Sequence, residues 1–497
     1  MSEMIKGFDN EKYITLQSEN IRERINRFGG RLYLEFGGKL FDDYHAARVL
    51  PGFDPDSKVK MLLQLKDQIE IVIAINVSDI ERNKVRGDLG ITYDLDVLRL
   101  IDAFRTNGFL VGSVVLTQYA SQPAADTFQK HLEMLGVQVY RHYYIEGYPS
   151  NVNAIVSESG YGKNDYIEVE RPLVVVTAPG PVSGKMSVCL SQLFHDYIRG
   201  IDAGYAKFET FPIWNLPVMH PINLAYEAAT ADLRDVNMID PFHLSTYGEQ
   251  ATSYNRDVEL FPVLAELMRR ILKVDVYKSP TDMGVNMAGY CMLDEHVIIK
   301  AAQQEIIRRY YTALCNHRKG LVSDDEVYKV ELLMKQANLS SDLRPVIAAS
   351  LKKEAATDGP AVAIQLHTGQ IVTGKDSALL GSSSALLLNA LKTLAGISDE
   401  IHLLSPIVIE PLQNLKVTHL GGSNPRLHTD EVLVALAISA PTNPMAELVL
   451  KSLKELRGCE AHSTVILSSV DENIFRKLGV NLTCEPKYQT SKLYHGI

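Results

Sequence analysis

The sequence predicts an α/β protein in which a doubly wound parallel sheet comes first, a helical middle region follows, and a second α/β domain completes the chain. Three observations predict this order. Apolar runs alternate with helix-like stretches over residues 1–215, which favours parallel strands joined by helices. Over residues 216–355 the apolar residues recur at a helical spacing. After a Gly359-Pro360 break, residues 356–497 return to a mixed pattern.

In the first segment, each predicted strand is a short apolar run, and each predicted helix has apolar residues three or four apart. The run at 173–177 is continuously apolar and rich in valine, as expected for a strand buried on both faces. The predicted strands are 31–38, 70–76, 110–119, 137–145, 172–177 and 205–211, and the helices between them include 58–67, 93–108, 124–136 and 188–200.

The later segments follow the same criteria. The middle region predicts helices at 223–233, 258–272, 295–317 and 325–339. The third segment, 356–497, is predicted to contain a hairpin at 361–375, a helix at 384–396, a strand at 401–406, helices at 430–440 and 446–458, and a strand at 461–467.

Composition narrows the class of protein. The 497 residues carry a net charge of -10 and contain no long basic block, so we expect no nucleic-acid partner. No signal sequence or membrane-spanning apolar stretch is present, so we expect a cytoplasmic protein without a membrane partner. The five cysteines are dispersed, which favours buried free thiols over disulfides or a structural zinc site. A homo-oligomer is compatible with this composition.

The strongest motif is TAPGPVSGKMS, a buried strand followed by a glycine-rich turn and a helix. Glycines let backbone N–H groups turn toward a phosphate, and the helix N-terminus and a lysine add positive charge. The sequence therefore predicts a site for a phosphorylated small molecule. Its candidate binding residues are Thr177, Gly180, Ser183, Gly184, Lys185 and Ser187.

The motif departs from the usual phosphate-binding loop. Three residues separate Gly180 from Gly184, and Met186 stands where a magnesium-binding hydroxyl is expected. A tight structural turn with a solvated Lys185 is the alternative. There are accordingly two hypotheses for function. The first is an enzyme that catalyses phosphoryl transfer or ATP-dependent ligation. The second is a noncatalytic phosphometabolite sensor or scaffold.

Downstream, GYAKFETFPIWNLP and MHPINLAYEAA give this region an order that resembles the deviant P-loop enzymes of the dethiobiotin synthetase and CTP synthase group. The resemblance implies ATP or another nucleotide with magnesium as cofactor. It also implies that Lys207 is a second phosphate lysine and Glu209 an acidic magnesium or substrate contact, whereas an ordinary strand-end lysine is the alternative.

A second turn, EFGGKLFDD, resembles the opening loop of the amino-acid kinases and offers Gly37, Gly38 and Lys39, although a structural turn explains it better.

Polar residues gather among turn formers in the middle region, in places where catalytic groups are often found. Capping and turn roles would explain the Asp and Asn residues equally well. The set comprises Asp240, His243, Tyr254, Asn255, Arg256, Lys278, Asp282 and Asn286. Together with Lys207 and Glu209, we take His243 and Asp282 as the candidate catalytic residues.

The third domain opens with a hairpin and with LLGSSSALLLNALK, which resembles a cytidine-deaminase fold. Ser382, Ser383 and Ser384 occupy the place of the zinc ligand, and no P-C-x-x-C follows, so the resemblance implies a zinc-free domain. The sequence also lacks the H-E-x-x-H of zinc proteases, and Met292 breaks the inverted motif near DEHV. We therefore expect neither zinc nor protease activity.

Across the chain, YLEFGGKLFDDYHAARVLPGFDPDSKVK, KFETFPIWNLP, HPINLAYEAATADL, YKSPTDMGVN and LGSSSALLLNALK carry a resemblance to the bacterial domain-of-unknown-function family 1846 over nearly the full length. This resemblance implies a family but no particular chemistry.

Overall fold

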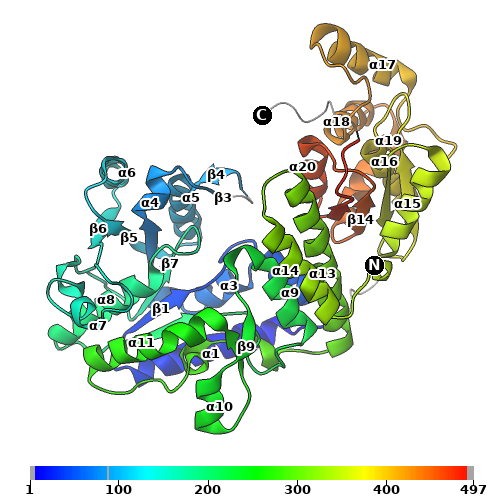
Figure 1. The fold of residues 1–497 in the computed structure, drawn as a ribbon. Helices are drawn as coiled ribbons and strands as arrows, with labels where there is room; N and C mark the ends of the chain where they lie inside the picture. Colours follow the sequence, from blue (N-terminus) through cyan, green and yellow to red (C-terminus); the bar gives the residue numbers. More distant parts are fainter. Residues whose placement is uncertain (1–5, 87–88, 490–497) are drawn as a thin grey trace. The chain divides into compact units, whose positions relative to one another are not determined.

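The computed structural model describes residues 6–86 and 89–489, and the chain divides into two compact units, Met1–Ala302 and Gln303–Ile497 (Figure 1). The predicted helical middle region is therefore shared between the two units. Within the described ranges, no helix combines the length and apolarity needed to cross a membrane.

The first unit is built on a seven-stranded sheet in which every strand pair is parallel, as the sequence predicted. β2 and β7 are buried along their whole length, which explains why apolar residues predominate in both. The strand order is β11-β8-β1-β7-β2-β5-β6. The strands are β1 (Leu32–Phe36), β2 (Ile69–Asn76), β5 (Leu110–Tyr119), β6 (Gln138–Tyr143), β7 (Leu173–Thr177), β8 (Gly204–Phe208) and β11 (Gly284–Val285). Two small antiparallel sheets of two strands each pair β3 (Val85–Arg86) with β4 (Ile91–Thr92) and β9 (Asn237–Ile239) with β10 (Thr252–Tyr254).

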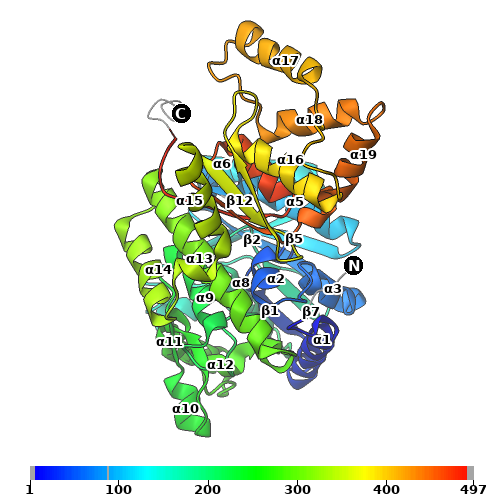
Figure 2. The same ribbon diagram turned by 90° about the vertical axis from the view of Figure 1, so that its right-hand side faces the viewer.

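Helices cover both faces of this sheet. α8 and α11 pack on one face and share a core with Val72, Val174 and Val176, whereas α1 and α3 lie on the other side of the strands (Figure 2). The helices of this unit are α1 (Asn10–Arg27), α2 (Tyr44–Val49), α3 (Ser57–Leu63), α4 (Val77–Glu81), α5 (Tyr93–Thr106), α6 (Pro123–Met134), α7 (Val152–Ile155), α8 (Lys185–Ile198), α9 (Pro221–Ala229), α10 (Pro241–Tyr247), α11 (Asn255–Leu272) and α12 (Pro280–Met283).

The strand order creates a switch point between β7 and β2. From β7, the chain runs through α8 to β8, on the far side of β1, whereas from β2 it continues to β5 in the opposite direction. Loops at the carboxyl ends of two such strands diverge and leave a crevice, which is where α/β sheets bind their ligands. The loop after β7 lies at this point.

The second unit contains a four-stranded sheet of order β13-β12-β14-β15, in which β12 is antiparallel to both neighbours and β14 is parallel to β15. The predicted hairpin is β12 (Ala361–Gln365) and β13 (Ile371–Lys375), followed later by β14 (Glu460–Ser463) and β15 (Asn481–Cys484). Its helices are α14 (Asp324–Gln336), α15 (Pro345–Thr357), α16 (Ser382–Leu394), α17 (Pro406–Asn414), α18 (Thr429–Ser439), α19 (Pro444–Lys451) and α20 (Ser469–Lys477), and α13 (Glu295–Arg318) spans the boundary between the units. α15 and α16 both pack against β12 and β13.

The predicted strand at 401–406 is wrong. These residues are irregular, and Pro406 begins α17, because proline fits the first turn of a helix and cannot donate to a strand ladder. Leu403 and Leu404 are nevertheless buried in the core of the second unit, which accounts for the apolar run. β11 and β15, which the sequence did not predict, are too short to show a period.

Candidate functional site

The loop after β7 connects the buried strand to α8 through two glycines, Gly180 and Gly184. Thr177 is buried at the end of β7, and Gly184 precedes α8 with a φ of +86°, a left-handed value that favours glycine. A Cβ at Gly180 would lie 2.3 Å from the Tyr93 hydroxyl, so glycine is needed there for space. The sequence had singled out both glycines, and Tyr93 supplies the steric reason for one of them.

Neighbouring strands hold the loop by its carbonyl groups. Thr117, at the end of β5, donates its hydroxyl to the Ser183 carbonyl at 2.8 Å, and Asn76, at the end of β2, donates its amide to the Val182 carbonyl at 3.4 Å. The N–H groups from Val182 to Ser187 donate to no described residue. Ser183 is 1% exposed, and its hydroxyl also lacks a partner among the described residues. The loop therefore presents a row of unused donors.

Lys185 begins α8 beside these donors. Its amino group forms no hydrogen bond or ion pair within residues 6–86 and 89–489. Burial lowers the pKa of Lys185, Glu35 opposes that shift, and the charges of Lys207 and Arg256 add to it. Met186 packs against the apolar core, so the residue that replaces the expected hydroxyl turns away from the loop. Ser187 lies in the first turn of the helix.

Lys207, near the end of β8, bridges two carboxylates. Its amino group lies 2.6 Å from Glu209 and 2.5 Å from Asp257, the latter in the first turn of α11. Burial alone would lower the pKa of Lys207, but Asp257 and Glu209 raise it well above its ordinary value. The second lysine is thus already neutralised, whereas Lys185 is not.

Glu35 completes the cluster from β1, which lies between β7 and β8. In the parallel pairing of β1 with β8, Glu35 is the register partner of Lys207. Its carboxylate accepts a hydrogen bond of 2.7 Å from the Tyr205 hydroxyl. Burial and the charge of Glu35 raise the pKa of Tyr205 well above its ordinary value, so this hydroxyl keeps its proton. Charged residues therefore lie at or just after the carboxyl ends of three adjacent strands: Lys207 at β8, Glu35 at β1 and Lys185 after β7.

His243 and Asp282 form a separate polar group on α10 and α12. His243 Nδ1 lies 3.2 Å from the Ser279 hydroxyl and 3.8 Å from Asp282. Asp282 also accepts from the Tyr247 hydroxyl and the Lys278 N–H. Because serine and aspartate face the same ring nitrogen, the arrangement differs from a nucleophilic triad, in which they face opposite nitrogens.

Tyr254 is buried at the end of β10, and four further polar residues of the middle region have structural partners. Asp240 caps α10 and accepts from Thr281, and Arg256 pairs with Asp235 at 3.1 Å. The Asn286 amide donates to the Pro212 carbonyl, and the Asn255 side chain accepts from the Val236 N–H. Of this set, Arg256 acts electrostatically on Lys185 and lowers its pKa.

The Gly37-Gly38 turn follows β1 at the same edge of the sheet. The Gly37 N–H donates to the Phe208 carbonyl at 3.2 Å, and Gly38 has a φ of +72°. A Cβ at Gly38 would lie 3.3 Å from the amino group of Lys58, which pairs with Asp43. Close packing therefore accounts for both glycines.

Sequence reasoning missed Glu35, Asp257 and Tyr205. Glu35 is a charged residue inside an apolar strand, two positions before a glycine turn, and that contrast was a usable signal. Asp257 adjoins Arg256, which the pattern had selected. Tyr205 gave no signal, because tyrosine is an ordinary strand residue.

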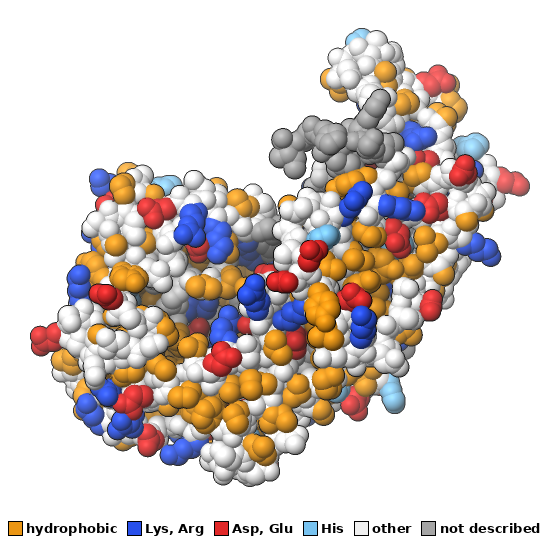
Figure 3. All heavy atoms as spheres, in the orientation of Figure 1, with side chains coloured by type: hydrophobic (Ala, Val, Ile, Leu, Met, Phe, Trp, Pro, Cys, Tyr) orange, Lys and Arg blue, Asp and Glu red, His pale blue; other side chains and the backbone are white. Residues whose placement is uncertain are grey.

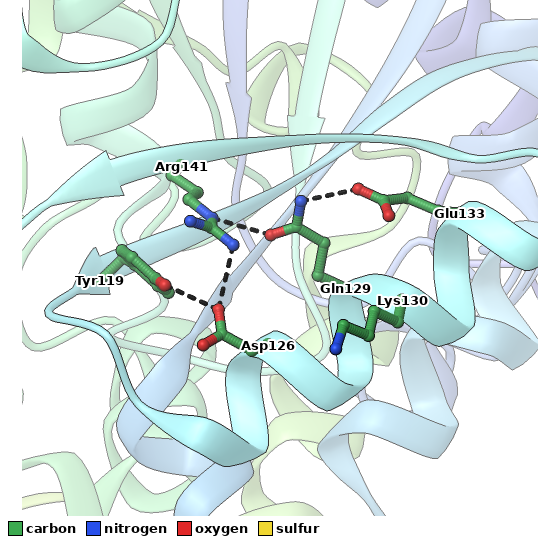
Figure 4. Close-up of a pocket in the computed structure, with 6 residues that line it drawn as sticks. All are labelled: Tyr119, Asp126, Gln129, Lys130, Glu133 and Arg141. Carbon is green, nitrogen blue, oxygen red and sulfur yellow. Dashed lines mark hydrogen bonds and ion pairs between the residues drawn. The ribbon is translucent and has the colours of Figure 1, made fainter.

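A shallow cavity of about 390 Å³ lies elsewhere, beside α6 and the ends of β5 and β6 (Figure 4). Its polar groups already bind one another: Asp126 accepts from Tyr119 and Arg141, and Gln129 bonds to Arg141 and Glu133. Lys130 stands exposed at its border. The satisfied network makes this cavity a weaker candidate than the loop after β7.

On the face drawn in Figure 3, acidic and basic side chains are intermixed over the first unit. This face offers no continuous area of one sign, and a bound anion would depend on local donors such as those of the loop.

Comparison with known families covers almost the whole chain. The models described as "Domain of unknown function DUF1846, N-terminal" and "Domain of unknown function DUF1846, C-terminal" match residues 6–338 and 342–494. A UPF0371 protein of Streptococcus pyogenes serotype M3 is 58% identical over 488 residues, which cover 98% of this chain and 99% of that protein. A UPF0371 protein of Streptococcus pneumoniae (strain CGSP14) is 55% identical over 489 residues, with the same coverage.

Proposed function

The chain belongs to the DUF1846 family, and we propose from the geometry of the β7–α8 loop that it binds a nucleotide or another phosphorylated small molecule there. The observation that carries this proposal is Lys185, which has no partner among the described residues. It lies beside backbone donors that those residues also leave unused, at the N-terminus of a 14-residue helix. Such a helix end and lysine together favour phosphate oxygens.

The reaction class that fits best is phosphoryl transfer or ATP-dependent ligation. In both, catalysis depends on positioning and on charge stabilisation of the transferred group, which the loop and Lys185 would supply. The chain offers no resident magnesium ligand at the expected place, since Met186 replaces the hydroxyl and Lys207 engages Glu209 and Asp257. Met186 is also the observation that favours the second function, a noncatalytic sensor or scaffold.

A ligand panel tests the proposal. We expect ATP, ADP or a sugar phosphate to raise the melting temperature of the full chain, because a ligand that binds only the folded state stabilises it. The same nucleosides or sugars without phosphate should give no shift. An unchanged melting temperature with every phosphorylated compound would count against a phosphate site.

For the second unit, we propose a zinc-free cytidine-deaminase-like architecture. Its support is the order β13-β12-β14-β15 with β12 antiparallel to its neighbours, together with Ser382 to Ser384 at the start of α16. Serine is not a usual zinc ligand, and the described residues contain no group of three or more His, Cys, Asp or Glu side chains placed to hold a metal.

We therefore expect elemental analysis of protein purified without added metal to find far less than one zinc per chain. Removal of metal by a chelator should leave the unfolding temperature unchanged, because no structural zinc would be lost. Stoichiometric zinc that survives dialysis would contradict the proposed zinc-free architecture.

A further inference from the structure

Three carboxylates share one lysine at the carboxyl edge of the first unit's sheet. The Lys207 amino group lies 2.6 Å from Glu209 Oε1 and 2.5 Å from Asp257 Oδ2, and Glu35 is the register partner of Lys207 on β1. Each carboxylate keeps one oxygen to which no residue of 6–86 or 89–489 donates, namely Glu209 Oε2, Asp257 Oδ1 and Glu35 Oε1. We call Glu35, Glu209 and Asp257 the carboxylate group. It carries more negative charge than Lys207 neutralises, and the Glu209 and Asp257 side chains are each 19% exposed, so solvent reaches it.

The carboxylate group lies on the face of the sheet from which Lys185 approaches. Tyr33 belongs to the core that α8 and α11 cover, and Glu35, two residues further along β1, points to the same face because side chains alternate along a strand. In the pairing of β1 with β7, Glu35 is opposite Val176, one residue before β7 ends and the loop begins. Burial lowers the pKa of Lys185, and among the neighbouring charges that of Glu35 opposes this shift most. Because adjacent strands are about 4.8 Å apart, one small molecule can reach both Lys185 and the carboxylate group.

A buried hydroxyl without a partner lies near the same group. Tyr254, directly before α11, is 5% exposed, and its hydroxyl forms no hydrogen bond within the described part of the chain. Burial raises the pKa of Tyr254 well above its ordinary value, and the charges of Glu209 and Asp257 add to that shift. Arg256 does not offset these charges, because it pairs with Asp235. Unsatisfied buried acceptors are costly, so this place suits a ligand that brings hydrogen-bond donors and positive charge.

We propose that the phosphorylated ligand also carries a protonated amine, which binds the carboxylate group while the phosphate binds the β7–α8 loop. The inference rests on the proposed phosphate site and names the class of its ligand, a phosphorylated amine. An ammonium group has one positive charge and three N–H donors, so it offsets negative charge and satisfies acceptor oxygens, whereas a neutral hydroxyl can only donate. A metal ion fits less well, because the described residues contain no set of three or more His, Cys, Asp or Glu side chains placed to hold one.

Two pairs of compounds isolate the contribution of the amine. Glucosamine-6-phosphate has an ammonium group where glucose-6-phosphate has a hydroxyl. Phosphoethanolamine differs from ethyl phosphate by an ammonium group that lies closer to the phosphate. Calorimetric titration of the full chain at neutral pH measures the Kd of each compound. In at least one pair, we expect the amine to bind about tenfold more tightly or better, because its hydrogen bonds to carboxylates are charge-assisted.

Two variants locate the amine. Asp257→Asn and Glu35→Gln each remove one carboxylate and nearly keep the side-chain shape. Each should reduce the preference for the amine by about fivefold or more and change the Kd of its amine-free counterpart little. The exposed Glu249→Gln is the matched control and should keep the wild-type preference. Circular dichroism checks that each variant is folded. If one variant does not fold, the other decides, and if neither folds, the two pairs of compounds decide with the wild-type chain.

The outcomes separate this inference from the proposed function. Equal affinities within both pairs would overturn the amine and leave the phosphate site standing. A preference that persists in both Asp257→Asn and Glu35→Gln would show that the amine binds elsewhere and would also overturn the inference. If ATP binds and none of these four compounds does, the inference fails alone. If no phosphorylated compound binds at all, the proposed function fails and the inference falls with it.

Discussion

Replacement of Lys185 by alanine should weaken the binding of ATP, or of whichever phosphorylated ligand the panel identifies, by about ten- to hundredfold or more. Lys185 is the first residue of α8, and no described residue forms an ion pair with it. A charge-assisted contact in a preorganised loop contributes roughly 1.5 to 3 kcal/mol. Isothermal titration calorimetry of the full chain measures this loss directly.

The matched control is Lys130→Ala, which removes an exposed lysine from α6 on another part of the first unit. Its affinity should equal that of the wild type. Lys185→Ala should also keep the wild-type melting temperature within a few degrees, because no ion pair is broken. Equal affinities for Lys185→Ala and wild-type protein would remove the main support for the loop as a phosphate site.

The β7–α8 loop could be located from the sequence because its signals are local. A continuously apolar strand, two glycines and a lysine follow one another within 13 residues, from Leu173 to Lys185. A glycine is a local signal because it meets a backbone requirement at its own position, such as the left-handed φ of Gly184. The parallel sheet was predictable for a similar reason, since burial on both faces leaves uninterrupted apolar runs.

The rest of the candidate site depends on strand order, which no local pattern encodes. Glu35 meets Lys207 because β1 and β8 are neighbours, although 171 residues separate them. Asp257 reaches the same lysine from α11. His243 and Asp282 show the converse, because their turn-rich sequences resemble those of catalytic loops, yet their side chains bind Ser279, Tyr247 and the backbone.

The largest loss of stability is expected from a residue outside the candidate site, Arg344, which ties together the second unit. It is 1% exposed, forms an ion pair with Glu460, and donates to the carbonyl groups of Ala461 at 2.9 Å and Asn481 at 2.8 Å. Glu460 also pairs with Arg308 from α13. One guanidinium therefore links the start of α15 to both β14 and β15.

Arg344→Met should lower the free energy of unfolding of the second unit by about 3 to 5 kcal/mol, because it leaves Glu460 short of a partner and removes the guanidinium donor from two strand carbonyls. Urea unfolding followed by circular dichroism should show the second unit unfolding at lower denaturant. Trp214, the only tryptophan, lies in the first unit, so its fluorescence follows that unit separately.

The control is Lys335→Met on α14 of the same unit, where the lysine side chain is 68% exposed and pairs with Glu331 one helical turn away. Solvent screens such a pair, so its loss should leave the free energy of unfolding close to that of the wild type. Each variant removes one cation from an ion pair, and the two differ in the burial of that pair and in the hydrogen bonds to β14 and β15 that only Arg344 makes. If both variants unfold at the same urea concentration as the wild type, Arg344 does not stabilise the sheet as its contacts indicate. If both unfold equally early, loss of positive charge rather than burial is the cause.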